Sequence, residues 1–440
     1  MCSSRAIEVF YFFYMIVNLY IALNTAIESF LGISPVRNAR KAAEEVDRNG
    51  GIFPSAEEQL PTMDLVMVAY LPNEKDIVVG QIMYALEEIV YPADKLRIIL
   101  VYNTPKPIEP LESHLHRLDK EYHQLRVIQV PNSKSKADNL NYFFSLPHSG
   151  ADFTGIFDTD HLPHPYNVRW AAERFCREKG NVDIVQGRCV VYNTQESFLS
   201  KMVAVEFDKI YAIAHPGRSR MFNFGLFCGS NGWWRTGILR NIKMNGHMLT
   251  EDIDSALRAY GSGKNAVHDM NVISYELATT TCQAFWKQRM RWTQGWTQAS
   301  IKHIPLIWTN PPIGKRTKRE RMGLTSLLFV RELSYYLVSQ HTCLLLSFVI
   351  TEWPHDVPSF VRLIFFRYPM AEWFLFANIA ALFATLWFTN KVRSEFTSWR
   401  SMLAFCLLYT PYLVVQATMG LYGHARELVK YSSWNPTARK

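Results

Sequence analysis

Long apolar runs stand at both ends of this 440-residue chain, with one mostly polar stretch between them. The first run covers residues 7–33, and three more follow late in the chain, at 324–350, 373–388 and 402–421. A helix needs roughly 20 apolar residues to cross a bilayer. We therefore expect membrane-embedded ends and one soluble block, rather than the about three average domains that the length alone allows.

The first apolar run is interpreted as a permanent anchor rather than a cleaved signal peptide. It is longer than the usual apolar core of a signal peptide, and no clear small-residue cleavage site precedes Pro35. We assign residues 1–36 to this anchor, 60–310 to the soluble domain, 322–425 to a membrane region and 426–440 to a basic tail.

Basic clusters at 37–41 and 315–321 flank the soluble block. Because Lys and Arg gather on the cytosolic side of a membrane, they place the block in the cytosol. Three later crossings would leave the tail outside, although the tail is also basic, with Arg426, Lys430, Arg439 and Lys440. The helix count therefore stays open. One late segment that is re-entrant or interfacial would resolve the conflict, and Pro411 offers a place to bend.

The formal net charge of +8 is explained by the basic residues beside the apolar runs, where they meet anionic headgroups. Nucleic-acid binding is not expected. The seven cysteines show no metal-ligand spacing and are interpreted as reduced thiols. Neither charge nor cysteine content therefore indicates a function by itself.

Within the soluble block, apolar runs that are typical of strands alternate with segments that are typical of helices. Strands are expected at 64–70, 96–102, 125–130 and 155–157, with a helix at 77–90 between the first two. This alternation predicts a parallel α/β sheet. Ligands of such sheets bind at the carboxyl ends of the strands.

Two carboxylates, Asp158 and Asp160, follow the strand at 155–157. Carboxylates at this spacing suit Mg²⁺ or Mn²⁺ bound to a nucleotide diphosphate. We expect Asp160 to hold the metal ion and Asp158 to lie nearer the ribose or sugar. The competing interpretation is an ordinary Asp-x-Asp surface turn.

A second acidic motif is Thr250-Glu251-Asp252. Asp252 is the candidate base that removes a proton from an acceptor hydroxyl, and a direct displacement of this kind inverts the sugar's configuration. The motif is also typical of the start of a helix, with Thr250 as the cap and acidic residues in the first turn. Both interpretations are compatible.

Residues 288–292 supply an amide, a guanidinium and an indole in Gln288, Arg291 and Trp292. A guanidinium binds a diphosphate with two parallel hydrogen bonds, and an indole stacks on a sugar ring. The surrounding 283–308 segment is expected to be an interfacial helix. Two of its other tryptophans, Trp296 and Trp308, are assigned to the headgroup level.

These motifs, in this order, resemble those of the processive-type members of glycosyltransferase family 2, which include cellulose, chitin and hyaluronan synthases. The resemblance covers roughly 61–296 and rests on five motifs: Lys136-Ala-Asp-Asn-Leu-Asn141, Asp158-Thr-Asp160, Phe227-Cys-Gly-Ser230, Thr250-Glu-Asp252 and the Gln288 to Trp292 segment. It implies a GT-A-type, Rossmann-like α/β catalytic domain on the cytosolic side, with one N-terminal and about three C-terminal transmembrane or interfacial helices.

The resemblance also implies roles for individual residues. Asp252 would be catalytic and Asp160 would bind Mg²⁺ or Mn²⁺. The donor would contact Glu74, Lys136, Asp158, Gln288 and Arg291. The acceptor would contact Cys228, Gly229, Ser230 and Trp292.

Two departures from the family pattern affect the substrates. Family members place an aspartate after the second strand to recognise the base, whereas this chain has Asn103. The resemblance still favours a UDP-sugar over GDP-mannose. The membrane part is small for a protein that threads a polymer through a bilayer, so secretion would call for a homo-oligomer or a partner protein.

Other segments carry weaker signals. The Gln186-Gly-Arg188 segment is a candidate for a polar contact in the donor pocket, and Trp233 and Trp234 either shape the acceptor entrance or belong to the core. His161 is expected beside the metal site without binding the ion, and His164 in solvent.

The sequence thus predicts a membrane-bound inverting glycosyltransferase that extends a β-linked polysaccharide at the plasma membrane or Golgi. Its partners would be a nucleotide sugar, a growing glycan and the lipid bilayer. Transfer of one sugar to a lipid or lipophilic metabolite is the first alternative. An inactive membrane scaffold with a transferase fold is the second.

Overall fold

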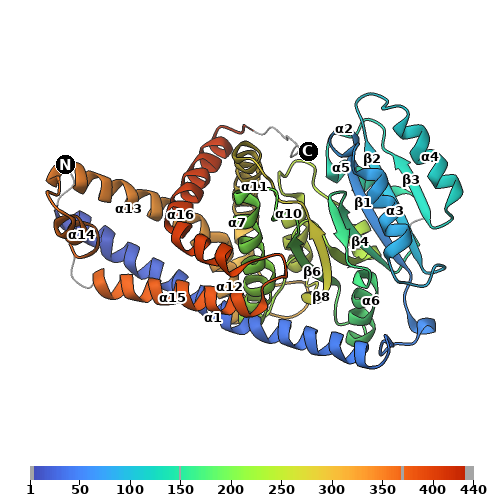
Figure 1. The fold of residues 1–440 in the computed structure, drawn as a ribbon, viewed down its shortest axis with the longest axis horizontal. Helices are drawn as coiled ribbons and strands as arrows, with labels where there is room; N and C mark the ends of the chain where they lie inside the picture. Colours follow the sequence, from blue (N-terminus) through green and yellow to red (C-terminus); the bar gives the residue numbers. More distant parts are fainter. Residues whose placement is uncertain (1–3, 148–149, 368–370, 432–440) are drawn as a thin grey trace.

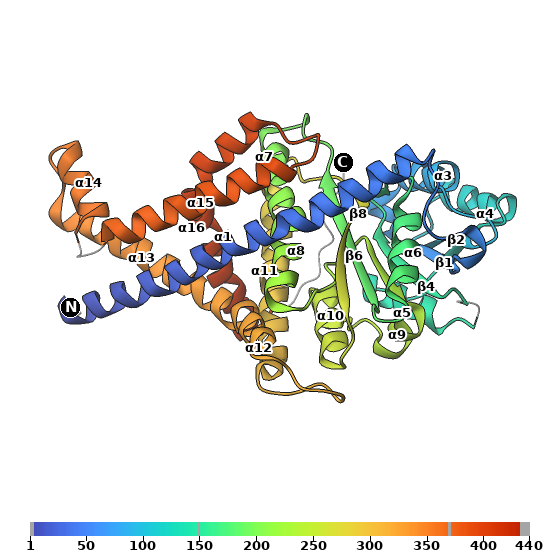
Figure 2. The same ribbon diagram turned by 90° about the horizontal axis from the view of Figure 1, so that it is seen from below.

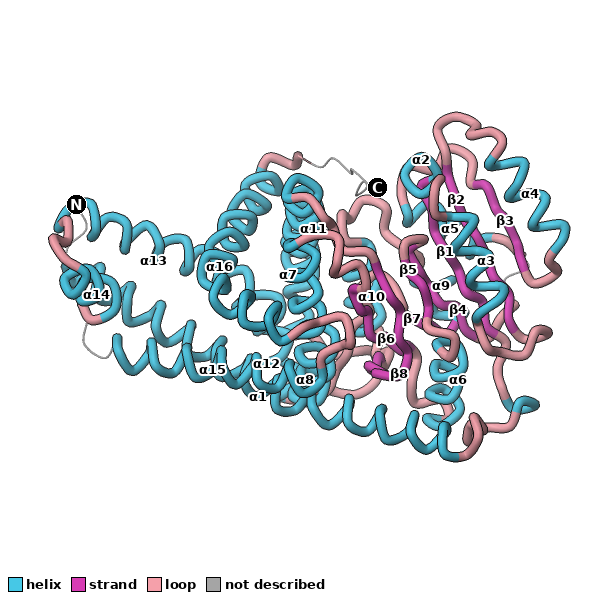
Figure 3. Tube along the Cα trace, viewed as in Figure 1, coloured by secondary structure: helices cyan, strands magenta, loops and turns pink. Residues whose placement is uncertain are grey.

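The computed structural model describes residues 4–147, 150–367 and 371–431. Figure 1 shows a domain built on a β-sheet at one end and a bundle of long helices at the other. Figure 3 shows the strands gathered in the first part, while the second is helical. The described residues form one eight-stranded sheet in the order β3-β2-β1-β4-β7-β6-β8-β5. This architecture confirms the predicted α/β fold with flanking long helices.

The first half of the sheet is parallel. Its strands are β1 (Met63–Tyr70), β2 (Leu96–Asn103), β3 (Leu125–Gln129) and β4 (Phe153–Asp158). Strand β1 is buried along almost its whole length, as parallel strands covered on both faces are. The pairing of β1 with β4 and with β2 brings Asp158 and Asn103 to the same edge. The four strands confirm the predicted ones within about two residues.

The second half of the sheet is mixed. Strand β7 (Gly232–Arg235) runs antiparallel to both β4 and β6 (Ile184–Val191). Strand β8 (Ala266–Glu276) pairs in parallel with β6 and antiparallel with the short β5 (His161–Pro163). These pairings carry β5, which directly follows Asp158 and Asp160, to the far edge of the sheet.

The paired tryptophans of β7 fill the core. Successive strand residues point to opposite faces, and both Trp233 and Trp234 are fully buried. Trp233 lies over Gly155 of β4, where an added Cβ would approach the indole to 2.8 Å. Trp233 and Trp234 therefore do not shape an acceptor entrance, and the core interpretation is confirmed.

Helices cover the sheet and connect it to the bundle. Those around the sheet are η1 (Glu57–Gln59), α2 (Leu71–Glu74), α3 (Val78–Glu88), α4 (Leu111–Glu121), α5 (Lys136–Ser145), α6 (Asn167–Glu178), α9 (Thr236–Ile242) and α10 (Glu251–Gly261). Those that connect it are α7 (Phe198–Phe207), the π-helical η2 (Asp208–Ala214), α8 (His215–Phe222), α11 (Cys282–His303) and η3 (Ile304–Ile307). Those of the bundle are α1 (Ser4–Arg48), α12 (Lys318–Thr325), η4 (Ser326–Val330), α13 (Arg331–Glu352), α14 (Val357–Phe365), α15 (Ala371–Val392) and α16 (Trp399–Leu428).

Among the residues that the structure describes, four helical segments are long and apolar enough to cross a membrane. They are Arg5–Arg48, Lys318–Glu352, Ala371–Val392 and Trp399–Leu428. Between the first and the others, α7 and α11 run crosswise to the long axis of the molecule (Figure 1). Helix α11 and η3 cover most of the 283–308 segment that the sequence predicts to be interfacial.

The N-terminal helix contacts the sheet domain as well as the bundle. Figure 2 shows α1 crossing from the free end of the bundle to the sheet domain. It continues beyond the predicted apolar run, through Pro35 to Arg48. Gly217 of α8 allows close contact, because a Cβ there would lie 1.9 Å from the Glu28 carbonyl oxygen. Glu28 also pairs with Arg218, at 3.1 Å.

Helix α16 bends in its middle (Figure 1), and it contains Pro411. Just before its first residue, Ser394 donates to the Asp208 carboxylate at 3.0 Å. Just after its last residue, the Tyr431 carbonyl accepts from Gln294 at 2.7 Å. Both ends of α16 therefore lie against the crosswise helices and η2. Arg439 and Lys440 of the predicted basic tail lie outside the described residues.

Candidate active site

A cavity of about 470 Å³ opens at the carboxyl edge of the parallel strands. Its wall is formed by loops of the sheet domain, by α7 and α11, by the start of α13 and by the second half of α16. Every residue to which the family resemblance gave a role lines this cavity: Glu74, Lys136, Asp158, Asp160, Cys228, Gly229, Ser230, Asp252, Gln288, Arg291 and Trp292.

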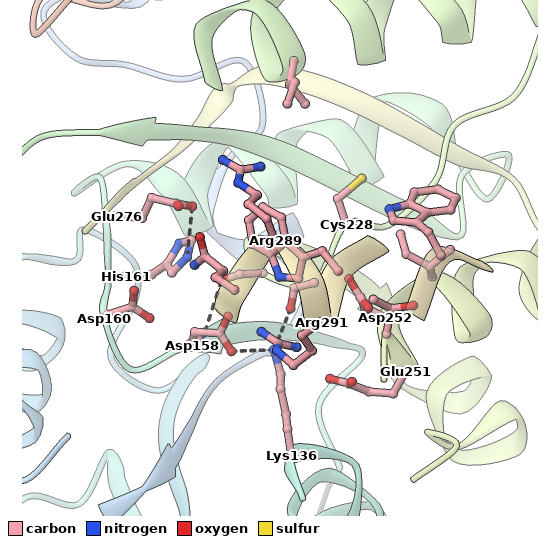
Figure 4. A pocket seen from close by; sticks show the side chains of 18 of the residues that line it. Lys136, Asp158, Asp160, His161, Cys228, Glu251, Asp252, Glu276, Arg289 and Arg291 are labelled. Atoms are coloured by element: carbon pink, nitrogen blue, oxygen red, sulfur yellow. Dashed lines mark hydrogen bonds and ion pairs between the residues drawn. The ribbon is translucent and has the colours of Figure 1, made fainter. Parts of the chain in front are cut away.

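Lys136 connects two of the motifs. Ser135 caps α5 by accepting from the Asp138 amide, which places Lys136 in the first turn. The Lys136 Nζ atom donates to Asp158 Oδ1 at 2.6 Å and to the Gly229 carbonyl at 2.7 Å (Figure 4). Burial lowers the pKa of Lys136, but attraction by Asp158 and Glu251 outweighs it and raises the pKa above its usual value. The lysine therefore stays charged beside the carboxylates.

Asp158, Asp160 and His161 form the group best suited to a divalent ion. Each offers one ligand atom, and these atoms lie within 4.8 Å of one another. Thr159 fixes the turn between the two carboxylates by donating to the Val68 carbonyl at 2.9 Å. Carboxylate oxygens are what Mg²⁺ and Mn²⁺ prefer, and imidazole is compatible with Mn²⁺. The donor set therefore fits the expected ion.

The two histidines of this turn differ in their surroundings. His161 is buried, with Nδ1 at 3.1 Å from Ser274 Oγ and Nε2 at 3.3 Å from Glu276 Oε2. Glu276 thus belongs to the site, and no sequence motif marked it. His164, which was expected in solvent, is only partly exposed, and its burial lowers its pKa.

Asp252 and Glu251 lie on the opposite side of the cavity from Asp158 and Asp160, with Lys136 and Arg291 between them (Figure 4). Both acids begin α10. Burial raises the pKa of Asp252, although Lys136 opposes the rise. Burial, together with the Asp252 charge, raises the pKa of Glu251 to about 7. The pair is therefore more basic than exposed carboxylates.

Thr250 precedes α10 as expected, but it does not cap the helix with its hydroxyl. Its Oγ1 has no hydrogen-bond partner among the residues that the structure describes. The segment is held instead by close packing against α11, because a Cβ on Gly295 would lie 2.5 Å from Thr250 Cγ2. The expected side-chain cap is wrong, and tertiary packing takes its place.

Gln186 supports the loop at 228–230 from behind. Its Oε1 accepts from the Cys228 amide at 2.8 Å, and its Nε2 donates to the Ser230 carbonyl at 3.0 Å. Ser230 Oγ in turn accepts from the Asp158 amide at 3.1 Å. Neither Gln186 nor Arg188, which pairs with Asp208 at 2.6 Å, lines the cavity. The expected donor contact of the Gln186-Gly-Arg188 segment is therefore wrong.

Helix α11 presents the third motif to the cavity. Arg291 donates to the Leu249 carbonyl at 3.3 Å, next to the Thr250-Glu251-Asp252 segment. Arg289 pairs with Glu206 of α7 at 2.7 Å, and its guanidinium lies 4.5 Å from the Trp292 ring centre. Tyr412 of α16 donates to the other oxygen of Glu206 at 2.6 Å. Trp292 is thus fixed by a network that reaches the bundle.

Asn103 ends β2, at the position where the sequence resemblance implies an aspartate. It lines the cavity, accepts from Asn139 Nδ2 at 2.9 Å and donates to the Ser133 carbonyl at 3.1 Å. Glu74 lies nearby, on the single turn of α2 that follows β1. The part of the cavity wall formed by Asn103 and Glu74 is therefore polar. The Asn103 amide is already oriented by its hydrogen bonds to Asn139 and Ser133.

Comparison with known proteins gives the family. The sequence model described as "Glycosyl transferase family group 2" matches residues 155–419, which is more than half of the chain. The chain belongs to this family. The membership confirms the resemblance that the motifs indicated and the glycosyltransferase character of the catalytic half.

Curated relatives of this family 2 chain are distant. A probable glycosyltransferase YdaM of Bacillus subtilis is 23% identical over 256 residues, covering 57% of this chain and 60% of the relative. The UDP-forming cellulose synthase catalytic subunit of Pseudomonas fluorescens is 23% identical over 271 residues, covering 59% and 34%. Probable glucomannan 4-beta-mannosyltransferase 7 of rice is 28% identical over 145 residues, covering 33% and 25%. The chain thus spans a quarter to three fifths of these relatives' lengths.

A solved structure shares the fold. The mannosyltransferase PcManGT from Pyrobaculum calidifontis, in complex with GDP-Man and Mn²⁺, aligns with a TM-score of 0.58 at 15% identity. The alignment covers 94% of this chain and all of the other. The likeness therefore includes the helix bundle as well as the glycosyltransferase domain.

Sequence reasoning missed several cavity residues of this glycosyltransferase. Trp296 was assigned to the headgroup level, yet it lines the cavity, whereas Trp308 is 68% exposed. Charged residues inside apolar stretches were the available signal, because such residues usually serve a function. The missed residues are Glu206, Tyr211, His215, Glu276, Arg289, Trp296, Arg331, Tyr335, Gln416 and Met419.

Proposed function

We propose that this protein is a membrane-bound, inverting hexosyltransferase that extends a β-linked polysaccharide of the cell surface or cell wall from a nucleotide sugar. The observation that carries the proposal is the arrangement of one cavity, with Asp158 and Asp160 on one side and Asp252 on the other. Relatives named as cellulose synthases and as a glucomannan mannosyltransferase support a polysaccharide product.

Asp252 is the base in this proposal. An acceptor hydroxyl loses its proton to the Asp252 carboxylate as its oxygen attacks the anomeric carbon from the side opposite the leaving diphosphate. This single displacement inverts the anomeric configuration. Burial supports the role, because it raises the pKa of Asp252 and so strengthens the base.

The donor diphosphate is held by cationic and polar side chains. Lys136 and Arg291 lie between the two acidic groups and meet the negative charge that grows on the leaving diphosphate. Gln288 and Glu74 complete the donor contacts, and Asp158 contacts the ribose or sugar. Asp160, with Asp158 and His161 beside it, would hold Mg²⁺ or Mn²⁺, which supplies Lewis-acid stabilisation of the diphosphate when bound.

The acceptor lies between the loop at 228–230 and Trp292. Gly229 has no side chain, so an acceptor can approach its backbone closely. The Trp292 indole offers an apolar face for a pyranose ring. The catalytic unit in this proposal is the segment 60–310.

The identity of the nucleotide is the finer part of the proposal. We favour a UDP-sugar, in agreement with the UDP-forming cellulose synthases. The fold neighbour was solved with GDP-Man and Mn²⁺, so GDP-mannose belongs in the test. Asn103 does not favour one nucleotide over the other, because an amide both donates and accepts hydrogen bonds.

In the membrane, the catalytic domain faces the cytosol, where nucleotide sugars are made. Helices α1, α13 and α15 cross the membrane, whereas the bent α16 begins and ends on the same side of it. This arrangement gives the tail the same side as the catalytic domain, as its basic residues require. The membrane is the plasma membrane or the Golgi, and export of a long product would use a homo-oligomer or partner.

Transfer of one sugar to a lipid is the second candidate. It is supported by the cavity wall itself, which includes Arg331 and Tyr335 of α13 and Gln416 of α16. An amphiphilic acceptor would reach Asp252 from the bundle without leaving the bilayer. The third candidate, an inactive scaffold, is opposed by the presence of every expected carboxylate in the cavity.

Washed membranes that contain the protein test the proposal. They are incubated with each labelled nucleotide sugar, including GDP-mannose, with Mg²⁺, Mn²⁺ or chelator, and the product is sized. High-molecular-weight material from one donor, lost with chelator and in Asp252→Asn, is the expected result. Label confined to a small lipid-extractable product would favour the second candidate, and no turnover of any donor would favour the scaffold.

A further inference from the structure

Three side chains of the kinds that bind zinc meet on one face of the sheet. Cys189 lies on β6, Glu276 ends β8 and His161 begins β5. Cys189 is in register with Ser274, two residues before Glu276, and His161 is in register with Glu276 itself. Side chains that are in register, or two residues apart along a strand, point to the same face of a sheet. The three neighbouring strands therefore bring a thiol, a carboxylate and an imidazole together.

The spacing of these groups suits a tetrahedral ion. One ligand atom from each of the three residues lies within 4.8 Å of the other two. The His161 Nε2 atom is 3.3 Å from Glu276 Oε2. Two ligand atoms that each bind zinc at about 2.1 Å, at the tetrahedral angle, lie about 3.4 Å apart. The imidazole and the carboxylate thus already have the separation of two zinc ligands.

The surroundings orient the imidazole and leave a way in. His161 Nδ1 lies 3.1 Å from Ser274 Oγ. With zinc on Nε2, the ring proton stays on Nδ1 and is donated to Ser274, as the second nitrogen of a zinc-bound histidine usually donates to a neighbour. His161 and Glu276 line the active-site cavity, whereas Cys189 is 1% exposed and does not. An ion would therefore enter from the cavity and keep its fourth position open towards it.

This group and the Asp158–Asp160 group select different ions. Carboxylate oxygens suit Mg²⁺ and Mn²⁺, whereas a thiolate with an imidazole suits zinc, which such ligands hold more tightly than Mn²⁺. The two groups nevertheless share one residue, because His161 belongs to both. An imidazole nitrogen that binds zinc is lost to a second ion.

We propose that His161, Cys189 and Glu276 form a zinc site beside the donor site, and that Zn²⁺ bound there inhibits transfer by withdrawing His161 from the Asp158–Asp160 group. Binding of zinc displaces the Cys189 thiol proton, which leaves to solvent, since the thiolate is the ligand. The inhibition rests on the proposed transferase function, whereas the binding does not.

Metal analysis of the full-length protein in detergent tests the binding. The protein is stripped with chelator, equilibrated with Zn²⁺ alone and freed of unbound ion, and its zinc content is measured. We expect about one zinc ion per chain. Cys189→Ser and Glu276→Gln each remove one ligand at little change in volume and should weaken zinc binding at least about tenfold.

Two further measurements make the binding result specific. Cys176→Ser makes the same change at a half-buried cysteine outside the active-site cavity and should keep the wild-type zinc content. Co²⁺ in place of zinc should give the absorption band of a thiolate-to-cobalt charge transfer, and this band should be absent in Cys189→Ser. Gel filtration of each variant identifies one that has failed to fold, in which case the other ligand variant decides.

The labelled-donor assay tests the inhibition. Zinc is titrated against a fixed excess of the ion that supports transfer, and each rate is divided by the zinc-free rate of the same protein. We expect Cys189→Ser to need at least about tenfold more zinc than the wild type for half inhibition, because one of its ligands is gone. Cys176→Ser should follow the wild type.

Other outcomes would overturn the proposal. A wild-type protein that retains no zinc, or ligand variants that retain as much as the wild type, removes the site. Equal inhibition of the wild type and Cys189→Ser places the inhibitory ion at Asp158 and Asp160 instead. Absence of transfer from any nucleotide sugar removes the proposed function and the inhibition, while the zinc content still decides whether the site exists.

Discussion

Gly229 lies directly against the Asp252 carboxylate: a Cβ added to Gly229 would be 2.8 Å from Asp252 Oδ2. Its φ of +95° is also one that L side chains rarely adopt. The Cys228-Gly229-Ser230 loop therefore approaches Asp252 with its backbone. Because Lys136 donates to the Gly229 carbonyl, the glycine joins the acidic motif of α10 to that of β4.

Gly229→Ala should displace either the loop or Asp252. We expect transfer to fall by about 100-fold or more, since an error of about 1 Å at a reacting group has effects of this size. Labelled-donor transfer in membranes measures it. Gly237→Ala is the matched control, because a Cβ there meets nothing within 4 Å, and its activity should stay normal. Normal activity in Gly229→Ala would show that the contact tolerates a methyl group.

Asp252→Asn should abolish transfer while it leaves metal-dependent nucleotide binding nearly intact. The amide keeps the shape of the side chain but cannot take the proton. Equilibrium binding of the nucleotide, measured beside transfer, separates the two functions. Loss of binding in this variant would move Asp252 from the base role to the donor site.

The pH dependence of kcat/KM should have an acid limb above the usual range of an aspartate. Burial raises the pKa of Asp252, although Lys136 opposes the rise, so protonation removes the base as pH falls through this raised pKa. Burial with the Asp252 charge raises the pKa of Glu251 to about 7. Glu251→Gln deletes one of two neighbouring negative charges and should shift the limb to lower pH. A limb that stays in place would show that Glu251 does not influence the base.

Trp292→Ala should shorten the product or raise the acceptor requirement, while hydrolysis of donor to free nucleotide persists. The indole offers a stacking face for the acceptor, and Arg289 and Glu206 hold it. Product sizing and nucleotide release, assayed together, give the two readouts. An unchanged product length would make Trp292 a structural residue of α11.

The bent α16 makes a topological prediction. A C-terminal tag on sealed, inside-out vesicles should be as accessible to protease as the catalytic domain, and an N-terminal tag should be protected. The reason is that both ends of α16 contact elements beside the catalytic domain, through Asp208 and Gln294. Protection of the C-terminal tag would mean that α16 crosses completely.

The site residues at 158–160, 250–252 and 288–292 could be predicted from the sequence, because their chemistry depends on residue type and spacing. The strands could be predicted because their apolar runs are short and bounded by turn residues. The residues that hold the site in place from outside the cavity could not be predicted from the sequence. Gln186 lies on a strand far along the chain from the loop it holds, and nothing in its neighbours marks its amide as a partner of Cys228 and Ser230.

Thr250 and Trp296 show why local signals fail. Thr250 has the ideal residue type for a helix cap, but Gly295 of α11 packs against it and decides its position. Trp296 lies in an amphipathic segment beside membrane helices, where an interfacial role is usual, but Arg331 from a distant helix encloses it in the cavity. In both cases a contact distant in sequence overrides local preference.

The close fit of α1 affects how the chain folds. Val36 of α1 is buried with Ala212, Ile213 and Met270, and the Ala39 carbonyl accepts from Asn271 at 3.0 Å. The ribosome makes α1 first, whereas these partners emerge much later. The apolar face of the second half of α1 therefore has no partner until these later residues have been made. Deleting α1 would not release a soluble enzyme but would leave the domain without one of its walls.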